Sequence, residues 1–255
     1  MEFCSANFYD TTTQIAVNSN TLTAGYVLSR DIRRQYTSQG FNNDLTTSTM
    51  TISFDETTTI DRIVMLGHNI KGMNIYYGGV TANAFVLTGP TTTSQFTGNT
   101  ETSLYMPITT PIAVTSVTFD FKSTMVANSE KAIGYILLTA KEYTFPRVPA
   151  AGDYKPVLKP KELKHELSTG GIRTHVVDQK WNVKLKYKYF SSTDRDSLKT
   201  IYDDHETKAF IPFNTTSGWD GIVFESNWTG PFEFYAYSDN ASSSGFSGSI
   251  TLEET

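Results

Sequence analysis

The sequence predicts a mainly β protein built from two β-sandwich domains, the second of which carries one helix. Threonine is abundant, with 38 residues of which 28 precede residue 146, and Tyr and Phe together number 30. These residue types favour strands. Charged residues make up only 18% of the chain, and few segments show the apolar spacing of a helix. Both observations are typical of an all-β or nearly all-β chain.

A cluster of prolines divides the chain. Four of the nine prolines lie within fifteen residues, at Pro146, Pro149, Pro156 and Pro160. Proline fixes its own φ and favours extended geometry in the residue before it. We therefore expect a first domain at residues 1–145, an extended connector at 146–167 and a second domain at 168–255. Within the connector, residues 146–160 are expected to have almost no regular structure.

Short alternating segments fill the first domain. In residues 49–54, Met50, Ile52 and Phe54 share one face of an expected strand. Further strands are expected at residues 60–66, 73–77, 84–87, 104–106, 114–121 and 132–140. Their spacing of roughly ten residues, with turn residues between them, predicts a β-sandwich.

The clearest strand of the second domain is expected at residues 181–189. Its apolar face is expected to hold Trp181, Val183, Leu185, Tyr187 and Tyr189, and its polar face Asn182, Lys184, Lys186 and Lys188. Such alternation predicts one buried and one solvated face.

One helix is expected at residues 193–205. Thr193 is its expected N-cap, and Leu198, Ile201 and Tyr202 recur at helical spacing. Strands are expected again at residues 209–213, 231–237 and 246–252, which completes a β-sandwich with one helix.

No constellation of catalytic or metal-binding residues stands out. The single Cys4 excludes an internal disulfide framework, and the four His, at 68, 165, 175 and 205, are too scattered for a metal motif. The acidic pairs are neighbours in sequence only, so they predict no catalytic dyad. We expect no enzyme activity, no metal and no cofactor.

The overall charge and hydropathy exclude two further classes. The net charge of −5 argues against nonspecific nucleic-acid binding. No apolar run approaches the roughly 20 residues of a membrane span, and no signal peptide opens the sequence.

Several side chains are candidates for contacts between subunits or with a partner. Arg30, Arg33 and Arg34 are predicted either to grip a partner's carboxylate or to form internal salt bridges. Trp219 and Trp228 lie in aromatic turns, where they could plug the sandwich, anchor a protein interface or stack on a sugar.

The lysines of residues 181–189 are a further candidate. An acidic neighbour, such as the Asp203-Asp204 helix end of the next copy, would pair with Lys184 and Lys186, and Tyr235 would add an aromatic anchor.

The first domain resembles the galactose-binding-like, or discoidin (coagulation factor 5/8 type C), sandwich. The segments that carry the resemblance are Leu28-Ser29-Arg30-Asp31, Gln35-Tyr36-Thr37-Ser38, Met50-Thr51-Ile52-Ser53-Phe54, Ile60-Asp61-Arg62-Ile63-Val64-Met65, His68-Asn69, Met73-Asn74-Ile75-Tyr76-Tyr77 and Ile133-Gly134-Tyr135-Ile136-Leu137-Leu138. The resemblance implies a jelly-roll sandwich and makes His68, Asn69 and Tyr76 candidate glycan contacts. His68 could equally cap a turn.

The second domain resembles modules of tailed-bacteriophage tail and baseplate proteins. The resemblance rests on Leu167-Ser168-Thr169-Gly170-Gly171, the strand at 181–189, the helix at 193–205, and Phe210-Ile211-Pro212-Phe213. It implies a distal-tail-like structural protein of the virion, assembled in the host cytoplasm. Its partners would be further copies in a ring, other tail proteins and, through the first domain, a host-surface glycan. The alternative is a stand-alone carbohydrate-binding, lectin-like protein.

Overall fold

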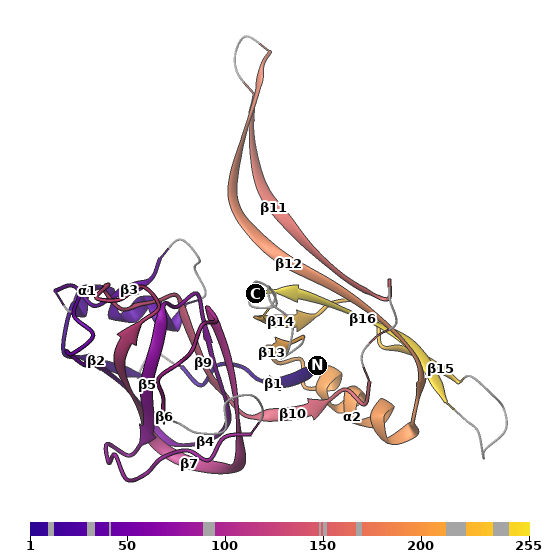
Figure 1. The fold of residues 1–255 in the computed structure, drawn as a ribbon. Coiled ribbons are helices and arrows are strands. Elements are labelled where there is room, and N and C mark those ends of the chain that lie inside the picture. Colours follow the sequence, from indigo (N-terminus) through magenta and orange to yellow (C-terminus); the bar gives the residue numbers. More distant parts are fainter. Residues whose placement is uncertain are drawn as a thin grey trace. The chain divides into compact units, whose positions relative to one another are not determined.

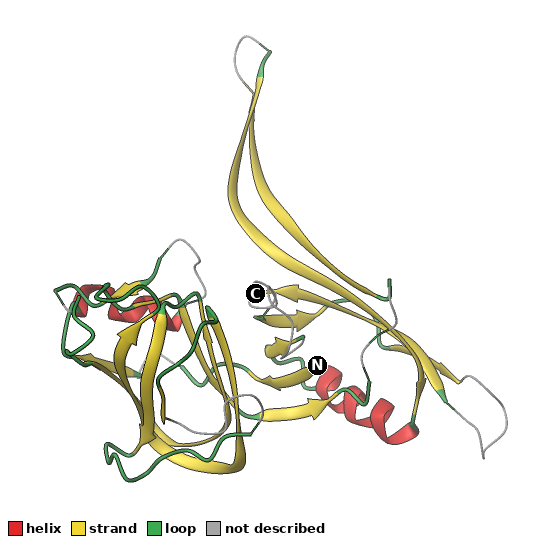
Figure 2. Cartoon of the chain, in the orientation of Figure 1, coloured by secondary structure: helices red, strands yellow, loops and turns green. Residues whose placement is uncertain are grey.

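The computed structural model describes residues 1–9, 13–29, 34–40, 42–88, 95–147, 149, 152–166, 170–212, 223–236 and 245–255. The chain forms two compact units (Figure 1). We call Asn7–Lys141 the sandwich unit, and Met1–Ala6 together with Glu142–Thr255 the hairpin unit. Both consist mostly of strands, which confirms the mainly β class (Figure 2).

The first six residues correct the expected domain boundary. Strand β1 (Glu2–Ser5) pairs antiparallel with β13 (Lys208–Ile211), which lies about 200 residues later in the chain. Phe3 is buried, and its ring centroid lies 5.3 Å from that of Phe145 and 5.8 Å from that of Phe210. Residues 1–6 therefore belong to the hairpin unit, and the sandwich unit is inserted between β1 and the rest of it.

Two long strands form the frame of the sandwich unit. Its strands are β2 (Gln14–Val17), β3 (Tyr36–Thr37), β4 (Ser48–Leu66), β5 (Ile70–Tyr77), β6 (Gln95–Phe96), β7 (Ser103–Thr124), β8 (Ala132–Ile133) and β9 (Tyr135–Thr139), with the short helices α1 (Thr21–Ala24) and η1 (Gly25–Leu28). The first half of β4 pairs with β2 and the second half with β9, while β7 pairs with β4 along its length and with β5 near its end. The same two strands thus serve both layers of a β-sandwich.

The expected strands of the first domain are mostly pieces of these longer ones. Residues 49–54 and 60–66 are the two halves of β4, and residues 104–106 and 114–121 both lie in β7. Residues 84–87 form only isolated bridges, Tyr76 with Ala84 and Leu87 with Ile108. Met50 and Ile52 lie in one buried cluster, as the alternation predicted, and Phe54 is partly buried against it.

The hairpin unit is one sheet with one longer helix. The sheet order is β10-β1-β13-β14-β16-β12-β11, and β15 also pairs with β16. The remaining bounds are β10 (Lys141–Thr144), β11 (Tyr154–Glu166), β12 (Ile172–Phe190), β14 (Phe224–Trp228), β15 (Glu233–Ala236) and β16 (Phe246–Glu254). Helix α2 (Ser192–Asp203) buries Leu198 and Ile201 in the core of this unit.

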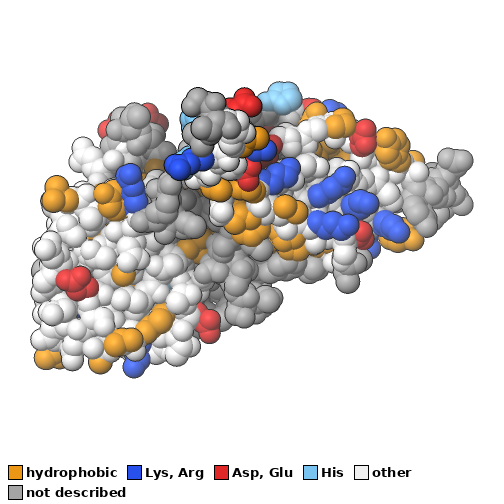
Figure 3. Space-filling view, turned by 90° about the horizontal axis from the view of Figure 1, so that it is seen from above, with side chains coloured by type: hydrophobic (Ala, Val, Ile, Leu, Met, Phe, Trp, Pro, Cys, Tyr) orange, Lys and Arg blue, Asp and Glu red, His pale blue; other side chains and the backbone are white. Residues whose placement is uncertain are grey.

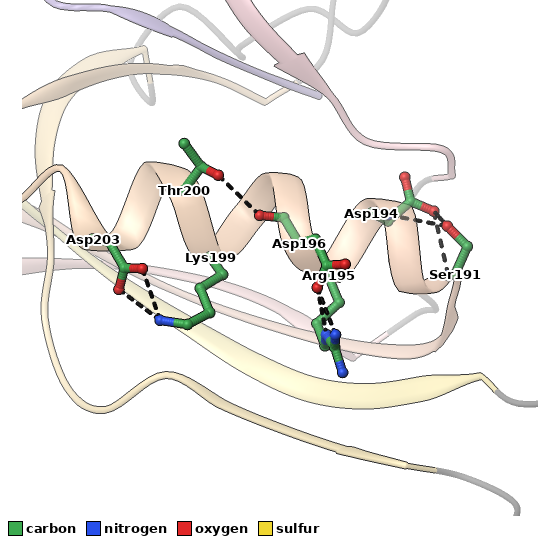
Figure 4. Close-up of polar contacts among 7 residues, drawn as sticks. All are labelled: Ser191, Asp194, Arg195, Asp196, Lys199, Thr200 and Asp203. Carbon is green, nitrogen blue, oxygen red and sulfur yellow. Dashed lines mark hydrogen bonds and ion pairs between the residues drawn. The ribbon is translucent and has the colours of Figure 1, made fainter.

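Helix α2 begins earlier than the sequence predicted. Ser191, not Thr193, is the N-cap: its hydroxyl accepts from the Asp194 amide at 3.0 Å, and the Asp194 carboxylate accepts from the Ser191 amide at 3.3 Å (Figure 4). This reciprocal capping box needs a carboxylate or amide side chain three residues after the cap. Ser191 has one in Asp194, whereas the Asp196 carboxylate, three residues after Thr193, accepts from the Arg195 guanidinium instead.

The expected connector is partly a strand. Strand β11 occupies residues 154–166 and pairs with β12. The expectation that residues 146–160 have almost no regular structure is therefore wrong from Tyr154 onward. Pro156 and Pro160 fit within β11 because it is the last strand of the sheet, and the outer side of an edge strand needs no amide donors.

The expected strand at residues 181–189 is the second half of β12. Val183, Leu185 and Tyr187 are buried and the intervening lysines are exposed, as predicted. Tyr189 departs from the pattern: its φ is 63° and its side chain is exposed. The pairing with β16 shifts between Tyr187 and Phe190, and this bulge turns Phe190 into the core in place of Tyr189.

Candidate functional site

Strands β11 and β12 extend beyond the rest of their sheet. Strand β16 pairs with β12 only from Asn182 to Phe190, whereas β11 follows β12 as far as the pair of Glu166 with Ile172. Residues 158–166 and 172–181 therefore form a two-stranded ribbon that reaches away from the rest of the hairpin unit (Figure 1). Both faces of such a ribbon are open to solvent, and two strands alone are marginally stable.

The ribbon exposes large apolar side chains. They are Leu158 (41% exposed), Leu163 (50%), Ile172 (66%) and Val176 (54%). Leu158 lies opposite Trp181, on the face that continues the buried core, and Val176 and Ile172 follow on that face. Leu163 lies on the other face. The apolar surface is thus present on both sides of the ribbon.

Lysines gather on one face of the hairpin. Across β11 and β12, Lys155 lies directly opposite Lys184, and Lys159 directly opposite Lys180. Lys186 and Lys188 continue the row along β12, and Figure 3 shows basic side chains gathered over this part of the unit. We call these six residues the lysine face. None of the six forms an ion pair with any residue that the structure describes.

Carboxylates gather at the other margin of the same sheet, around Lys208. The buried Lys208 Nζ lies 2.9 Å from Glu142, 3.3 Å from Glu206 and 3.7 Å from Asp204. Burial disfavours the charge on Lys208, but the hydrogen bonds and charges of Glu142 and Glu206 outweigh it and raise the pKa of Lys208. Three carboxylates thus surround one ammonium group, and we call them, with Asp203, the acidic end.

Helix α2 ends within this cluster. Asp203 pairs with Lys199 at 2.7 Å (Figure 4), while Asp204 is the C-cap of the helix, whose last turn holds no basic residue. A helix C-terminus carries partial negative charge, so carboxylates there are unfavourable.

The residues predicted to contact a partner lie in different surroundings, and three of them are not described by the structure. Arg30, Arg33 and Trp219 lie outside the described residues. Arg34 lies over the Tyr26 ring, 5.4 Å from its centroid. Lys184 and Lys186 belong to the lysine face, and Tyr235 on β15 is 67% exposed.

Trp228 packs inside the hairpin unit. Its ring centroid lies 5.4 Å from Tyr202, 5.8 Å from Phe232 and 6.3 Å from Phe3. Of the three roles open to this residue, the arrangement matches a plug of the core.

His68 and Asn69 hold the turn after β4. The buried His68 accepts a hydrogen bond at Nδ1 from the Ile70 amide at 3.1 Å, and burial lowers the pKa of His68 to about 4. The Asn69 side chain donates to the Glu130 carbonyl at 2.7 Å and accepts from the Ala132 amide at 2.8 Å. Both side chains therefore bind neighbouring backbone of the sandwich unit.

Tyr76 lies toward the opposite end of β5. Its hydroxyl donates to Asp120 at 3.5 Å, and the Thr49 hydroxyl donates to the same carboxylate oxygen at 2.9 Å. Burial, with the charge of Asp120, raises the pKa of Tyr76. The structure does not bring Tyr76 together with His68 and Asn69, but it forms a polar sheet face around Tyr76.

Sequence reasoning missed half of the lysine face. Lys155, Lys159 and Lys180 were not singled out because the prolines around the first two indicated a connector. The available signal was the number of lysines in this segment, at residues 155, 159, 161 and 164, which equals the number in β12, at residues 180, 184, 186 and 188.

The described residues hold no group of three or more His, Cys, Asp or Glu side chains arranged for a metal ion. The lone Cys4 is buried. Within the described ranges, no helix is both long and apolar enough to cross a membrane.

Comparison with known proteins gives structural neighbours only. No protein-family model matches the sequence, and no curated protein sequence matches it. A family 32 carbohydrate-binding module from Clostridium perfringens in complex with galactose is similar, with 11% identity, a TM-score of 0.41 and coverage of 55% of this chain and 99% of the module.

Two further neighbours have similar statistics. A chitosan-binding module from a Paenibacillus chitosanase/glucanase has 10% identity and a TM-score of 0.42, and covers 53% of this chain and 99% of the module. An F5/8 type C domain from Bacteroides fragilis has 16% identity and a TM-score of 0.38, and covers 55% of this chain and 98% of that domain.

Proposed function

We propose that this chain is a structural subunit that assembles with copies of itself through the β11–β12 hairpin, with the sandwich unit as an accessory module. The observation that carries the proposal is the ribbon, a two-stranded extension with apolar side chains exposed on both faces. A ribbon of this kind gains stability when a neighbour covers it.

The exposed apolar side chains determine how much free energy the ribbon gains when a neighbour covers it. Burying a Val, Leu or Ile side chain completely contributes about 1.5–3 kcal/mol. The four ribbon residues are each roughly half exposed. Covering them contributes about 1 kcal/mol each, or about 4 kcal/mol in each subunit contact.

The assembly we propose is a ring in the tail or baseplate of a tailed phage, formed in the host cytoplasm. The sequence resemblance of the second domain to tail modules supports this, together with a sheet that carries one helix and a long hairpin. Immunogold labelling of particles with antibodies to this chain tests the location. Label at the tail is expected, and particles without label would contradict it.

Shortening the hairpin tests the assembly. Leu158 and Trp181 lie directly opposite each other, so replacing residues 159–180 with Asn-Gly closes the strands by a two-residue turn. Sedimentation should give a multimer for the intact chain and a folded monomer for the shortened one. An unchanged multimer would show that the ribbon is not the joint.

Point variants provide a matched control. Ile172→Ser with Val176→Ser should weaken the multimer, whereas Leu45→Ser with Val126→Ser should not. All four side chains are exposed, but the second pair lies in the sandwich unit.

The second candidate function is carbohydrate binding by the sandwich unit. The favouring observation is the Tyr76 ring beside the Asp120 carboxylate on a polar sheet face. Aromatic rings beside carboxylates suit sugars, since the ring packs on C–H groups and the carboxylate accepts from hydroxyls. Screening the intact chain and Tyr76→Ala on a glycan array tests it. Binding lost in the variant is expected, and an array without signal would contradict it.

A further inference from the structure

Within the proposed homo-oligomer, on which this inference rests, we infer that the contact is head-to-tail: the lysine face of one copy pairs with the acidic end of the next. The partner is thus a second copy of this chain. Each surface is locally unfavourable in a single copy, and the two have opposite charge.

The strand register of the hairpin makes the lysine face electrostatically unfavourable, because it places lysines opposite lysines. Like charges directly opposite each other on neighbouring strands destabilise a sheet. The hairpin contains two such pairs, Lys155 with Lys184 and Lys159 with Lys180, with no carboxylate paired to either among the described residues. A negatively charged surface placed over this face would convert the repulsion into attraction.

The position of the acidic end at the C-terminus of helix α2 makes its negative charge electrostatically unfavourable. Asp203 and Asp204 close helix α2, where the helix dipole disfavours carboxylates. Lys208 neutralises only part of the charge of Glu142, Asp204 and Glu206, so excess negative charge remains. Glu206 is 72% exposed and open to a neighbour, and Asp203 is 53% exposed although Lys199 already pairs with it.

The sheet places the two surfaces at opposite margins. The lysine face lies on β11 and β12, the last two strands of the order. The acidic end involves β10, the first strand, through Glu142, and β13 through Lys208. A contact between opposite margins of successive copies is heterologous, and it forms a closed ring when the rotation between copies closes.

The charges set register more than affinity. Exposed ion pairs contribute about 0.2–1 kcal/mol each and weaken as salt screens them. The apolar ribbon supplies the larger share. Assembly of the intact chain is therefore expected to weaken, without being abolished, between about 0.05 M and 0.5 M NaCl.

Charge reversal on each surface tests the inference. One variant carries Lys155→Glu, Lys159→Glu, Lys180→Glu and Lys184→Glu, which makes the net charge of the lysine face negative. The other carries Asp203→Lys and Glu206→Lys, and it leaves Glu142 and Asp204 to hold Lys208. Each variant alone should need at least about tenfold more protein for half-assembly, because both of its surfaces then have the same sign. An equimolar mixture should assemble at a lower protein concentration than either variant alone, because each joint between the two variants pairs opposite charges. Lys71→Glu in the sandwich unit is the matched control.

Each outcome has one meaning. If the intact chain forms a multimer and either variant alone assembles equally well, the inference is wrong and the proposed function stands. If the intact chain stays monomeric, the proposed function and the inference both fail. A mixture that stays dissociated while both variants retain native Trp fluorescence also overturns the inference. So does salt-sensitive binding of duplex DNA that the lysine variant alone loses, with assembly unchanged.

Discussion

Acidification should destabilise the sandwich unit through His68. The folded-state pKa of His68 is about 4, below its ordinary value of 6.5, because burial disfavours the charged imidazole. The unfolded chain therefore binds the proton more tightly. The stability that neutral His68 contributes is present above pH 6.5 and is lost as the pH falls from 6.5 toward 4. Since one pKa unit corresponds to about 1.4 kcal/mol, the loss approaches about 3 kcal/mol at pH 4.

The two units can be followed separately. All three Trp residues lie in the hairpin unit, so Trp fluorescence reports that unit alone. Hydrogen exchange of peptides from β4 and β5 reports the sandwich unit. Between pH 7 and 4.5, the free energy of opening of these peptides should fall further in the intact protein than in His68→Gln. His175→Gln, an exposed histidine of the hairpin, is the control. Equal losses in the intact protein and His68→Gln would refute the reasoning.

Three further changes test local stability. Lys131→Met removes the donor to two loop carbonyls at 2.9 Å and 3.0 Å, and hydrogen exchange should show a loss of about 2 kcal/mol in the sandwich unit. Ser191→Ala removes the helix cap and should cost about 1 kcal/mol in urea unfolding followed by Trp fluorescence, whereas Thr193→Ala should cost less than about 0.5 kcal/mol. Gly134→Ala places a Cβ 3.1 Å from the Leu66 carbonyl and should destabilise β9 by about 1 kcal/mol, measured by hydrogen exchange. A destabilisation of the hairpin unit by Lys131→Met, or equal effects of the two cap variants, would contradict these assignments.

The parts of the fold visible in the sequence are those with a local signal. Alternation predicted the buried face of β12 because Val183, Leu185 and Tyr187 follow the period of a strand with one buried side. The interruption at Tyr189 was not predictable in this way, since a bulge depends on the partner strand β16.

Long-range pairing explains the two main corrections. Strand β1 has only four residues, and its place is set by β13 and by Phe145 and Phe210, far along the chain. Strand β11 was predicted as a connector because proline normally interrupts a sheet. Pro156 and Pro160 are compatible with a strand only at an edge, and sequence order does not reveal which strand is the edge.

In the candidate site, too, the features with a local sequence signal were predictable, and those set by long-range pairing were not. Lys184 and Lys186 were predicted on a solvated face from alternation alone. Their opposition to the lysines of β11 is a property of register, which the sequence does not show. Trp228 illustrates the converse, since an aromatic residue in a turn is equally suited to a core plug or an interface until its neighbours are known.

The mass of the intact chain at equilibrium, measured by native mass spectrometry over a range of concentrations, tests the central claim most directly. A subunit has a mass of 28.4 kDa. Assembly through the hairpin into a closed ring predicts one discrete multiple of three or more subunits, which becomes dominant as the concentration rises. A single species of subunit mass at every concentration would contradict the claim.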